Sequence, residues 1–210
     1  MNLLIVGATG GTGRALLDQA LGQGHTVTAF VRNPAKLRVT HERLRVVTGN
    51  VLDYDSIDTA VQGEDAVLSA LGHKRWFIKT TILSEGTKNS ISAMEKHGVR
   101  RFICETSLGV GDSRGRLGLY YTLFVIPVIT FFYFKDKRRQ EQLIRESSLD
   151  WVIVRPGQLT NGRKRAKYRH GEKIGSYVLT VRISRADVAD FMLRQLTDNS
   201  YLRRTSGVAY

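Results

Sequence analysis

The chain has 210 residues, of which 42% are hydrophobic, and its 32 Lys and Arg against 19 Asp and Glu give a formal net charge of +13. This length and apolar content are typical of one domain with a large core. A single cysteine, Cys104, excludes disulfides within the chain and metal sites built on several cysteines, and its apolar neighbours predict a small core residue in a reducing compartment.

The positive charge attracts anions of every kind. The cations are spread over many segments and no nucleic-acid motif with interleaved aromatics occurs, so we expect no nucleic-acid partner. An NADP site, an anionic substrate or an anionic membrane surface accounts for the charge at least as well. The histidines form no ligand set, which predicts no metal, and no leader precedes the first apolar run, which predicts a cytoplasmic protein.

The chain opens on an apolar run at 3–6, which predicts a buried strand, followed by the turn GATGGTG at 7–13. Gly7 lets the chain turn off the strand, Gly10 lets the backbone approach a pyrophosphate, and Gly13 lets the next helix pack on the sheet. Helical spacing over 14–21 supplies that helix, whose N-terminal amides attract the pyrophosphate. The predicted pyrophosphate site comprises Gly7, Thr9, Gly10, Gly11, Thr12 and Gly13.

The second predicted strand, 26–31, ends at the position where an acidic residue would bind the free ribose hydroxyls of NAD. Arg32 occupies that position, and Lys36 follows closely. Because a guanidinium attracts a 2′-phosphate, this pattern predicts NADP as the cofactor. A solvated basic loop stays open as the alternative.

Further strands are predicted at 44–47, 66–71, 101–104 and 151–154, with a helix over 80–97 that Gly98 closes. Alternating strands and helices predict one Rossmann domain over 1–210, an α/β fold with a doubly wound parallel sheet and helices on both faces. Ligands of such sheets bind at the carboxyl ends of the strands, near the switch point between strands one and four.

Residues 117–134 contain no charged residue and are flanked by basic ones, and their length approaches that of a bilayer span. Pro127 near the middle argues against crossing, as does the return of the next strand to the same sheet. Three interpretations of the segment 114–134 stay open: a lid over the acceptor pocket, a subunit interface of a homodimer, and an apolar surface resting on a membrane with its basic flanks on anionic headgroups.

Motifs along nearly the whole chain resemble those of atypical short-chain dehydrogenases/reductases, in the group of NmrA-like proteins and the flavin reductase also called biliverdin reductase B. They are GATGGTG at 7–13, VR at 31–32, GNVL at 49–52, LG at 71–72, SEG at 84–86, TS at 106–107, LIRES at 143–147, VRP at 154–156 and DVADFML at 187–193. The resemblance favours the lid among the three interpretations of 114–134.

The resemblance also implies roles for residues at the strand ends. It places Asn50 and Val51 at the adenine, although the family usually has an aspartate where Asn50 stands, and Leu71 and Gly72 along the nicotinamide ribose. Ser107 would face the nicotinamide or the acceptor. Strand-end residues that complete the predicted cofactor site are Thr106, Ser107, Lys137, Arg155 and Pro156.

The predicted catalytic residues are Ser107, Tyr133 and Lys137. A tyrosine and a lysine four residues apart share one helix face, where the ammonium can orient the phenol and the cofactor ribose. The phenol can then protonate a carbonyl oxygen as hydride arrives, with the serine hydroxyl as second donor. In a lysine-rich chain with eight tyrosines an accidental match stays open, so Lys137 is the stronger candidate, for cofactor ribose or phosphate.

We therefore expect an NADPH-dependent reductase that transfers hydride to a planar lipophilic acceptor, either a flavin as substrate or a linear tetrapyrrole such as biliverdin. Such an acceptor needs stacking more than a protein acid, because water can supply the proton. The basic segment 163–170 would bind acidic groups of the acceptor, or form a solvated hairpin. The alternative is a non-catalytic NADP-binding regulator or membrane-associated assembly factor.

Overall fold

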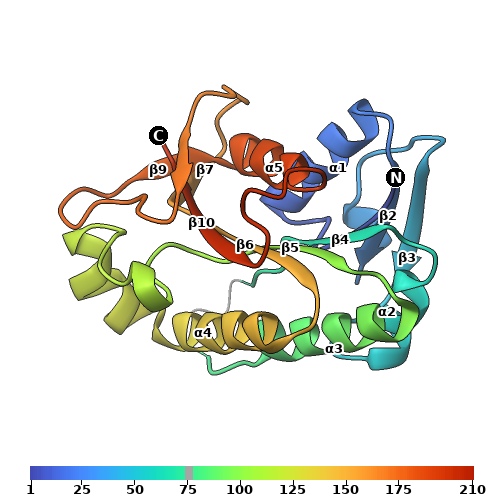
Figure 1. Ribbon diagram of the computed structural model, residues 1–210, viewed down its shortest axis with the longest axis horizontal. Helices are drawn as coiled ribbons and strands as arrows, with labels where there is room; N and C mark the ends of the chain where they lie inside the picture. Colours follow the sequence, from blue (N-terminus) through green and yellow to red (C-terminus); the bar gives the residue numbers. More distant parts are fainter. Residues whose placement is uncertain (74–77) are drawn as a thin grey trace.

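Six strands that follow one another along the chain make up most of the main sheet in the computed structural model, which describes residues 1–73 and 78–210 (Figure 1). They are β1 (Asn2–Val6), β2 (Thr26–Val31), β3 (Leu44–Thr48), β4 (Ala66–Ser69), β5 (Arg101–Glu105) and β6 (Asp150–Pro156). They pair in parallel in the order β3-β2-β1-β4-β5-β6, so the order reverses between β1 and β4. The predicted Rossmann fold and its switch point are confirmed.

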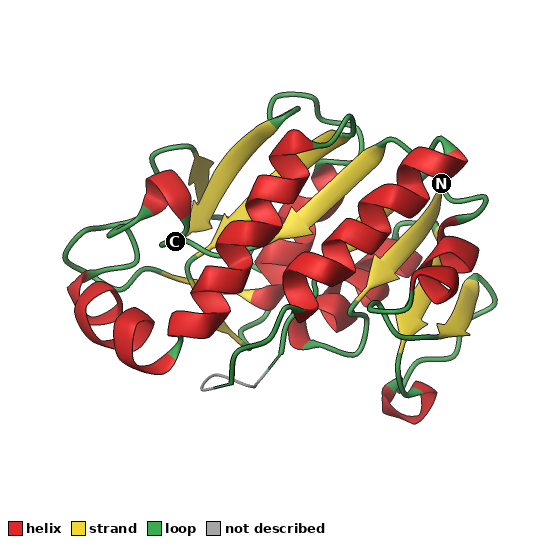
Figure 2. Cartoon of the chain, turned by 90° about the horizontal axis from the view of Figure 1, so that it is seen from below, coloured by secondary structure: helices red, strands yellow, loops and turns green. Residues whose placement is uncertain are grey.

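Helices cover both faces of this sheet (Figure 1). On one face lie α1 (Gly11–Gly22) and α5 (Arg185–Arg194), and on the other lie α2 (Tyr54–Val61), α3 (Ile82–His97) and α4 (Phe131–Glu146), which Figure 2 shows in front of the strands. The strands between the edges are buried on both sides for this reason, which explains their continuous apolar runs. Cys104 on β5 is fully buried, and burial raises the pKa of its thiol to about 12.

Local signals fix two of the helix ends. Gly98 ends α3 with a left-handed φ of 71°, as predicted, and its amide donates to carbonyl oxygens of the last turn. Ser184 begins α5, where its hydroxyl accepts from the amide of Asp187 at 3.0 Å. The Asp187 carboxylate in turn accepts from the amides of Arg165 and Ala166, each at 2.8 Å, so the first turn of α5 fixes part of the basic segment 163–170.

The C-terminal strands were not predicted. They are β7 (Gln158–Thr160), β8 (Arg169–Gly171), β9 (Arg182–Ser184) and β10 (Arg204–Ala209). In the described chain β10 extends the main sheet beside β6 in parallel, β8 adds an antiparallel edge, and β7 pairs with β9 in a small second sheet. Three of these strands have only three residues, too few for an apolar period to be recognised.

The uncharged segment 117–134 forms a helical protrusion at one end of the sheet. It contains η3 (Tyr121–Ile129), a π-helix that includes Pro127, and the first turn of α4. Two short 3₁₀ helices, η1 (Pro34–Lys36) and η2 (Gly111–Ser113), complete the described helices. Over the described residues, none of the helices has both the length and the apolar character that a membrane crossing requires.

Candidate functional site: a dinucleotide cleft

The turn after β1 is built as the glycine spacing predicts. Gly7 has a φ of +85°, and a Cβ there would lie 2.7 Å from the carbonyl oxygen of Ala70 on the neighbouring strand end. A Cβ at Gly13 would lie 2.1 Å from the carbonyl oxygen of Gly7. Side chains at both positions are therefore excluded by the protein itself, since the turn and the helix start are in backbone contact.

Gly10 is different. A Cβ there would meet the Gly7 carbonyl oxygen at 3.2 Å and then only the Ala70 oxygen, at 4.0 Å. This contact is tight, but it is less severe than those at Gly7 and Gly13, so the protein itself excludes a side chain less strictly at Gly10. Close approach of a pyrophosphate to the backbone at the N-terminus of α1 would be a second reason for a glycine there.

A cleft of about 460 Å³ opens beside this turn, at the carboxyl ends of the strands. Its walls contain most of the predicted site residues: Gly7, Thr9, Gly10, Gly11, Thr12, Arg32, Lys36, Val51, Leu71, Gly72, Thr106, Tyr133 and Lys137. Phe30, Val31, Gly49, Ala70, His73, Glu105, Leu159 and Arg185 complete the lining. The fold thus assembles residues from the carboxyl ends of β1 to β5 around one space, together with residues of β7, α4 and α5, as expected at a switch point.

One end of the cleft is cationic. Arg32 and Lys36 line it, and the Arg14 guanidinium donates to the Lys36 carbonyl oxygen at 3.2 Å. Gly49 and Val51 form the wall beside them. The side chain of Asn50 does not line the cleft, because its Oδ1 accepts from the amide of Leu52 at 3.2 Å and shapes the turn instead. This end offers positive charge for a 2′-phosphate and an apolar wall for an adenine.

Packing of α3 behind Val51 requires a glycine at position 86, which the sequence analysis did not identify. A Cβ at Gly86 on α3 would lie 1.8 Å from Cγ2 of Val51. Gly86 therefore allows α3 to pack directly behind the adenine wall. The sequence analysis noted the SEG motif at 84–86, but the spacing of a motif does not show which residue its glycine contacts.

The other end of the cleft holds Tyr133 and Lys137, which share a face of α4 as predicted. The Lys137 Nζ lies 5.3 Å from the centroid of the Tyr133 ring, and the His73 ring packs edge-on to that ring at 5.0 Å between centroids. The Tyr133 hydroxyl is 3.9 Å from the position of a Cβ on Gly72. The tyrosine thus reaches the strand end at which the nicotinamide ribose is expected.

Lys137 is held rigidly. It is only 2% exposed, and its Nζ donates to the backbone carbonyl oxygen of Glu105 at 3.2 Å. Burial acts to lower its pKa, but Tyr133, Cys104 and Glu105 nearby outweigh burial and raise it. The ammonium therefore stays charged at the nicotinamide end of the cleft.

Glu105, at the end of β5, is a cleft residue that the sequence analysis missed. It is 7% exposed, and its Oε1 accepts from the Thr12 hydroxyl at 3.0 Å. Burial raises the pKa of its carboxyl, although Lys137, Thr12 and Arg185 oppose the shift. The available signal was an acidic residue directly after the apolar run of a predicted strand.

Thr106 and Ser107 follow Glu105, and their hydroxyls are engaged by the protein. The Thr106 Oγ1 donates to Glu141 at 2.7 Å, and the Ser107 Oγ donates to the Leu108 carbonyl oxygen at 2.9 Å. Thr106 lines the cleft, whereas Ser107 lies outside its lining. The structure brings Tyr133 and Lys137 together but does not bring Ser107 into the same wall.

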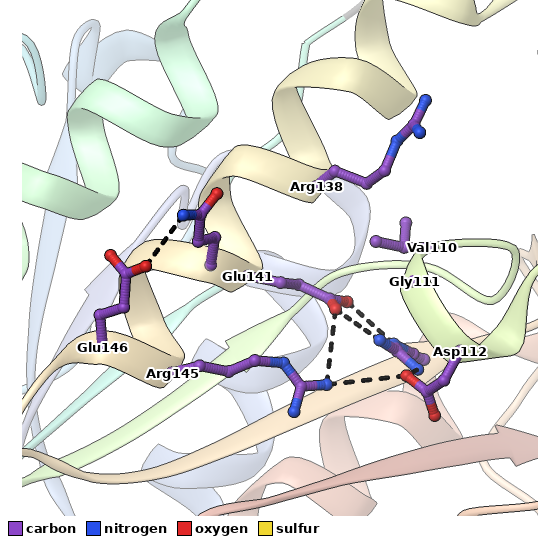
Figure 3. A pocket seen from close by; sticks show the side chains of 9 residues that line it. Val110, Gly111, Asp112, Arg138, Glu141, Arg145 and Glu146 are labelled. Atoms are coloured by element: carbon purple, nitrogen blue, oxygen red, sulfur yellow. Dashed lines mark hydrogen bonds and ion pairs between the residues drawn. The ribbon is translucent and has the colours of Figure 1, made fainter.

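Arg155 and Pro156 lie outside the cleft, contrary to their predicted place in it. Arg155 is 2% exposed, and its Nε donates to the Glu141 carboxylate on α4 at 2.9 Å, while its Nη1 donates to Asp112 at 2.7 Å. Arg155, Glu141 and Asp112 line a hollow of about 560 Å³, in which the Arg155 guanidinium pairs with both carboxylates (Figure 3). Because burial demands a partner for the guanidinium, Arg155 links β6 to α4 and does not face the cofactor.

Two further segments take positions that the sequence did not resolve. The basic segment 163–170 packs on α5, where the Lys164 ammonium lies 2.6 Å from Asp190 and the Tyr168 hydroxyl donates to the same carboxylate, and it does not line the cleft. Of the segment 117–134 only Tyr133 lines the cleft, so the residues expected to form a lid lie beside it. A separate cavity of about 310 Å³ under η3 has apolar walls and two arginines, Arg114 and Arg138.

Residues 7–199 match the model of an NAD(P)H-binding family. The chain belongs to this family. It is 36% identical, over 98% of its length, to the photosystem II assembly factor Ycf39 of Synechocystis, of which it covers 61%. It is 27% identical, over 74% of its length, to the divinyl chlorophyllide a 8-vinyl-reductase of Arabidopsis thaliana, of which it covers 39%.

Among solved structures, the anaerobilin reductase ChuY of Escherichia coli O157:H7 superposes with a TM-score of 0.82 at 23% identity, over 100% of this chain and 97% of that chain. This likeness shows the shared fold. The chain spans about three fifths of the length of the first curated relatives it matches. Membership of this family implies that the protein binds NAD(P)H, and the cleft beside the glycine turn is the candidate site for it.

Proposed function

We propose that the protein is an NADPH-dependent reductase of a planar lipophilic acceptor, a flavin or a linear tetrapyrrole. The observation that carries the proposal is the meeting of Tyr133, Lys137 and Gly72 at one end of a cleft whose other end holds Arg32. An aromatic face held by a buried ammonium next to the nicotinamide position is suited to stacking a conjugated acceptor.

Each residue of the cleft has a role in this proposal. Arg32 and Lys36 bind the 2′-phosphate, and the turn at 7–13 binds the pyrophosphate through its amides. Lys137 orients the ribose and Tyr133, while the Tyr133 ring forms a wall of the acceptor position. NADPH, when bound, supplies the hydride. Water can supply the proton to a conjugated acceptor, so an engaged Ser107 hydroxyl does not prevent the reaction.

Two of the related proteins support this acceptor class. Their names refer to reduction of anaerobilin and of divinyl chlorophyllide a, both compounds of the tetrapyrrole type. The cavity under η3 adds a structural argument, because Phe131, Phe134 and Arg138 of its lining come from the same turns of α4 as Tyr133 and Lys137. It offers apolar surface and positive charge for the acidic side groups of such an acceptor.

A second candidate is a non-catalytic NADP-binding assembly factor. The identity of 36% to Ycf39 over almost the whole chain favours it, since Ycf39 is named as a photosystem II assembly factor. In this alternative the dinucleotide regulates binding to a partner and no acceptor is reduced.

Steady-state oxidation of NADPH in the presence of FMN, FAD, biliverdin and a quinone panel separates the two candidates. We expect turnover with at least one flavin or tetrapyrrole. Tight NADP binding without turnover of any of these acceptors would contradict the reductase and support the assembly factor. The Val46→Ser variant, changed on the edge strand β3 away from the cleft lining, is the matched control for handling and folding.

A further inference from the structure

An apolar surface lies at the end of the sheet opposite β3. It consists of the exposed apolar side chains of residues 119–132 and of residues 177–179, and we call it the apolar cap. Its most exposed members are Leu179 at 71%, Leu123 at 70%, Val178 at 66%, Tyr177 at 62% and Tyr120 at 61%. Side chains of this size and exposure, gathered in one place, are unusual on a protein that works in free solution.

The two segments of the cap lie side by side at this end of the molecule, although they are more than forty residues apart in the chain (Figures 1 and 2). The Leu119 amide donates to the Val178 carbonyl oxygen at 3.2 Å, and the Ser176 amide donates to the Arg116 carbonyl oxygen at 2.8 Å. Gly118 has a φ of +97°, and a Cβ there would lie 2.7 Å from the Leu179 backbone. The sequence signal at 117–134 therefore describes only half of the surface.

Positive charge predominates at the border of the cap. The exposed carboxylates of Asp112 and Glu172 lie next to its segments in the chain and are paired with Arg155 and Arg204. Residues 113–135 and 173–186 contain no aspartate or glutamate. Four exposed cations stand in these segments: Arg114, Lys135, Lys173 and Arg182. A second copy of the chain would present the same border, so a symmetric contact through the cap would bring like charges together. A surface of anionic lipids is complementary to both the apolar centre and the basic border.

We propose that the apolar cap docks the protein on the surface of an anionic lipid bilayer. Leu123, Val178 and Leu179 enter the boundary between headgroups and acyl chains, and the bordering cations contact the headgroups. The aromatic rings of Tyr120, Phe124 and Tyr177 lie at headgroup depth, the position that amphipathic rings prefer. The proposal concerns a surface outside the dinucleotide cleft. Arg114 and Phe131 also line the cavity under η3, but vesicle binding is measured without an acceptor, so the test does not depend on which acceptor the protein reduces.

Flotation with vesicles tests the proposal. The full chain is mixed with vesicles of phosphatidylcholine alone, or of phosphatidylcholine with an equal part of phosphatidylglycerol. We expect the unchanged protein to bind the anionic vesicles. The variant Leu123→Ser/Val178→Ser/Leu179→Ser should lose affinity by about tenfold or more, because it lacks the three apolar side chains that would enter the bilayer. The charge variant Arg114→Glu/Lys135→Glu is expected to lose about tenfold or more on the anionic vesicles only.

The matched control is Val46→Ser, which removes an exposed apolar side chain, 42% accessible, from the opposite edge of the sheet. It is expected to bind vesicles as the unchanged protein does. NADPH affinity and thermal unfolding, measured for every variant, show whether each one is folded. Absence of binding to anionic vesicles, or equal binding by the folded triple variant, would overturn the proposal. So would a stable dimer in sedimentation that only the triple variant dissociates, since a second copy would then cover the cap.

Discussion

The glycine turn at 7–13 follows β1, and Arg155 and Pro156 are the last residues of β6 in the same sheet; both were predicted to bind the cofactor. In the structure the glycine turn lines the cleft, whereas the Arg155 guanidinium binds Glu141 and Asp112. The role of a glycine turn lies in its own backbone, which the local spacing determines. The role of a long charged side chain depends on what the fold places opposite it, here a carboxylate on α4 that lies fourteen residues earlier in the chain.

The sharpest test of this difference is Arg155→Met. It leaves the buried Glu141 without its main ion pair, so we expect a loss of about 3–5 kcal/mol in the free energy of unfolding. NADPH affinity, measured by calorimetry, should change by less than about threefold, a limit within the usual spread of surface effects. The double variant Arg155→Met/Glu141→Gln should recover part of the stability. A large loss of NADPH affinity in a folded Arg155→Met protein would return Arg155 to the cofactor site.

Two alanine substitutions distinguish the glycine that the fold requires from the glycine that the ligand requires. Gly13→Ala forces a Cβ against the Gly7 carbonyl oxygen, and we expect a loss of about 3 kcal/mol in chemical denaturation. Gly10→Ala, whose Cβ would meet the same oxygen at 3.2 Å, should cost less stability than Gly13→Ala and should lose NADPH binding, because an added methyl group on the turn hinders close approach of the pyrophosphate. Equal destabilisation by both substitutions would mean that Gly10 serves the fold and not the ligand.

Arg32→Glu tests the cationic end of the cleft. Loss of a charge-assisted contact to the 2′-phosphate should weaken NADPH binding by about 2 kcal/mol, or roughly thirtyfold. NADH, which lacks that phosphate, should bind no worse than before. Dissociation constants for the two cofactors, measured side by side, give the ratio that matters. An unchanged preference for NADPH over NADH would show that Arg32 does not bind the 2′-phosphate.

Tyr133→Phe distinguishes stacking from proton donation at the nicotinamide end. If Tyr133 serves as an aromatic wall, the rate of NADPH oxidation with the active flavin or tetrapyrrole should fall by less than about tenfold, since the ring remains. A general acid contributes about 10²- to 10⁴-fold. A loss of that size in kcat, with NADPH affinity unchanged, would show that the phenol donates a proton and would favour a carbonyl acceptor.

Glu105 should give the cleft a pH dependence. Burial raises the pKa of its carboxyl in the folded state, so the folded protein binds a proton that the unfolded chain releases near the ordinary value of 4.5. This contribution to stability is complete below that value and is lost as the pH rises through the raised pKa. Thermal unfolding across this range should therefore show that the melting temperature of Glu105→Gln increases relative to that of the unchanged protein as the pH rises. Parallel curves at every pH would contradict the raised pKa.

Much of the fold could be predicted because its signals are local. The apolar runs of β1, β2, β4, β5 and β6, the spacing of α3 and its end at Gly98 are short-range patterns that burial on both faces of a parallel sheet imposes. The strands β7, β8 and β9 could not be predicted, because each has only three residues and its pairing depends on partners far away in the chain. The buried Glu105 and the packing of Gly86 on Val51 likewise arise only when separate elements meet.

The sequence by itself determined the Rossmann order of elements, the glycine turn and the cation at Arg32, because each of these depends on residues close together in the chain. Only the tertiary structure decided that Tyr133 reaches Gly72, that Arg155 pairs with Glu141, and that residues 177–179 join 119–132 in one apolar surface. Such pairings join segments far apart in the chain. Burial, backbone contact and the need of a buried charge for a partner select them when the elements pack together.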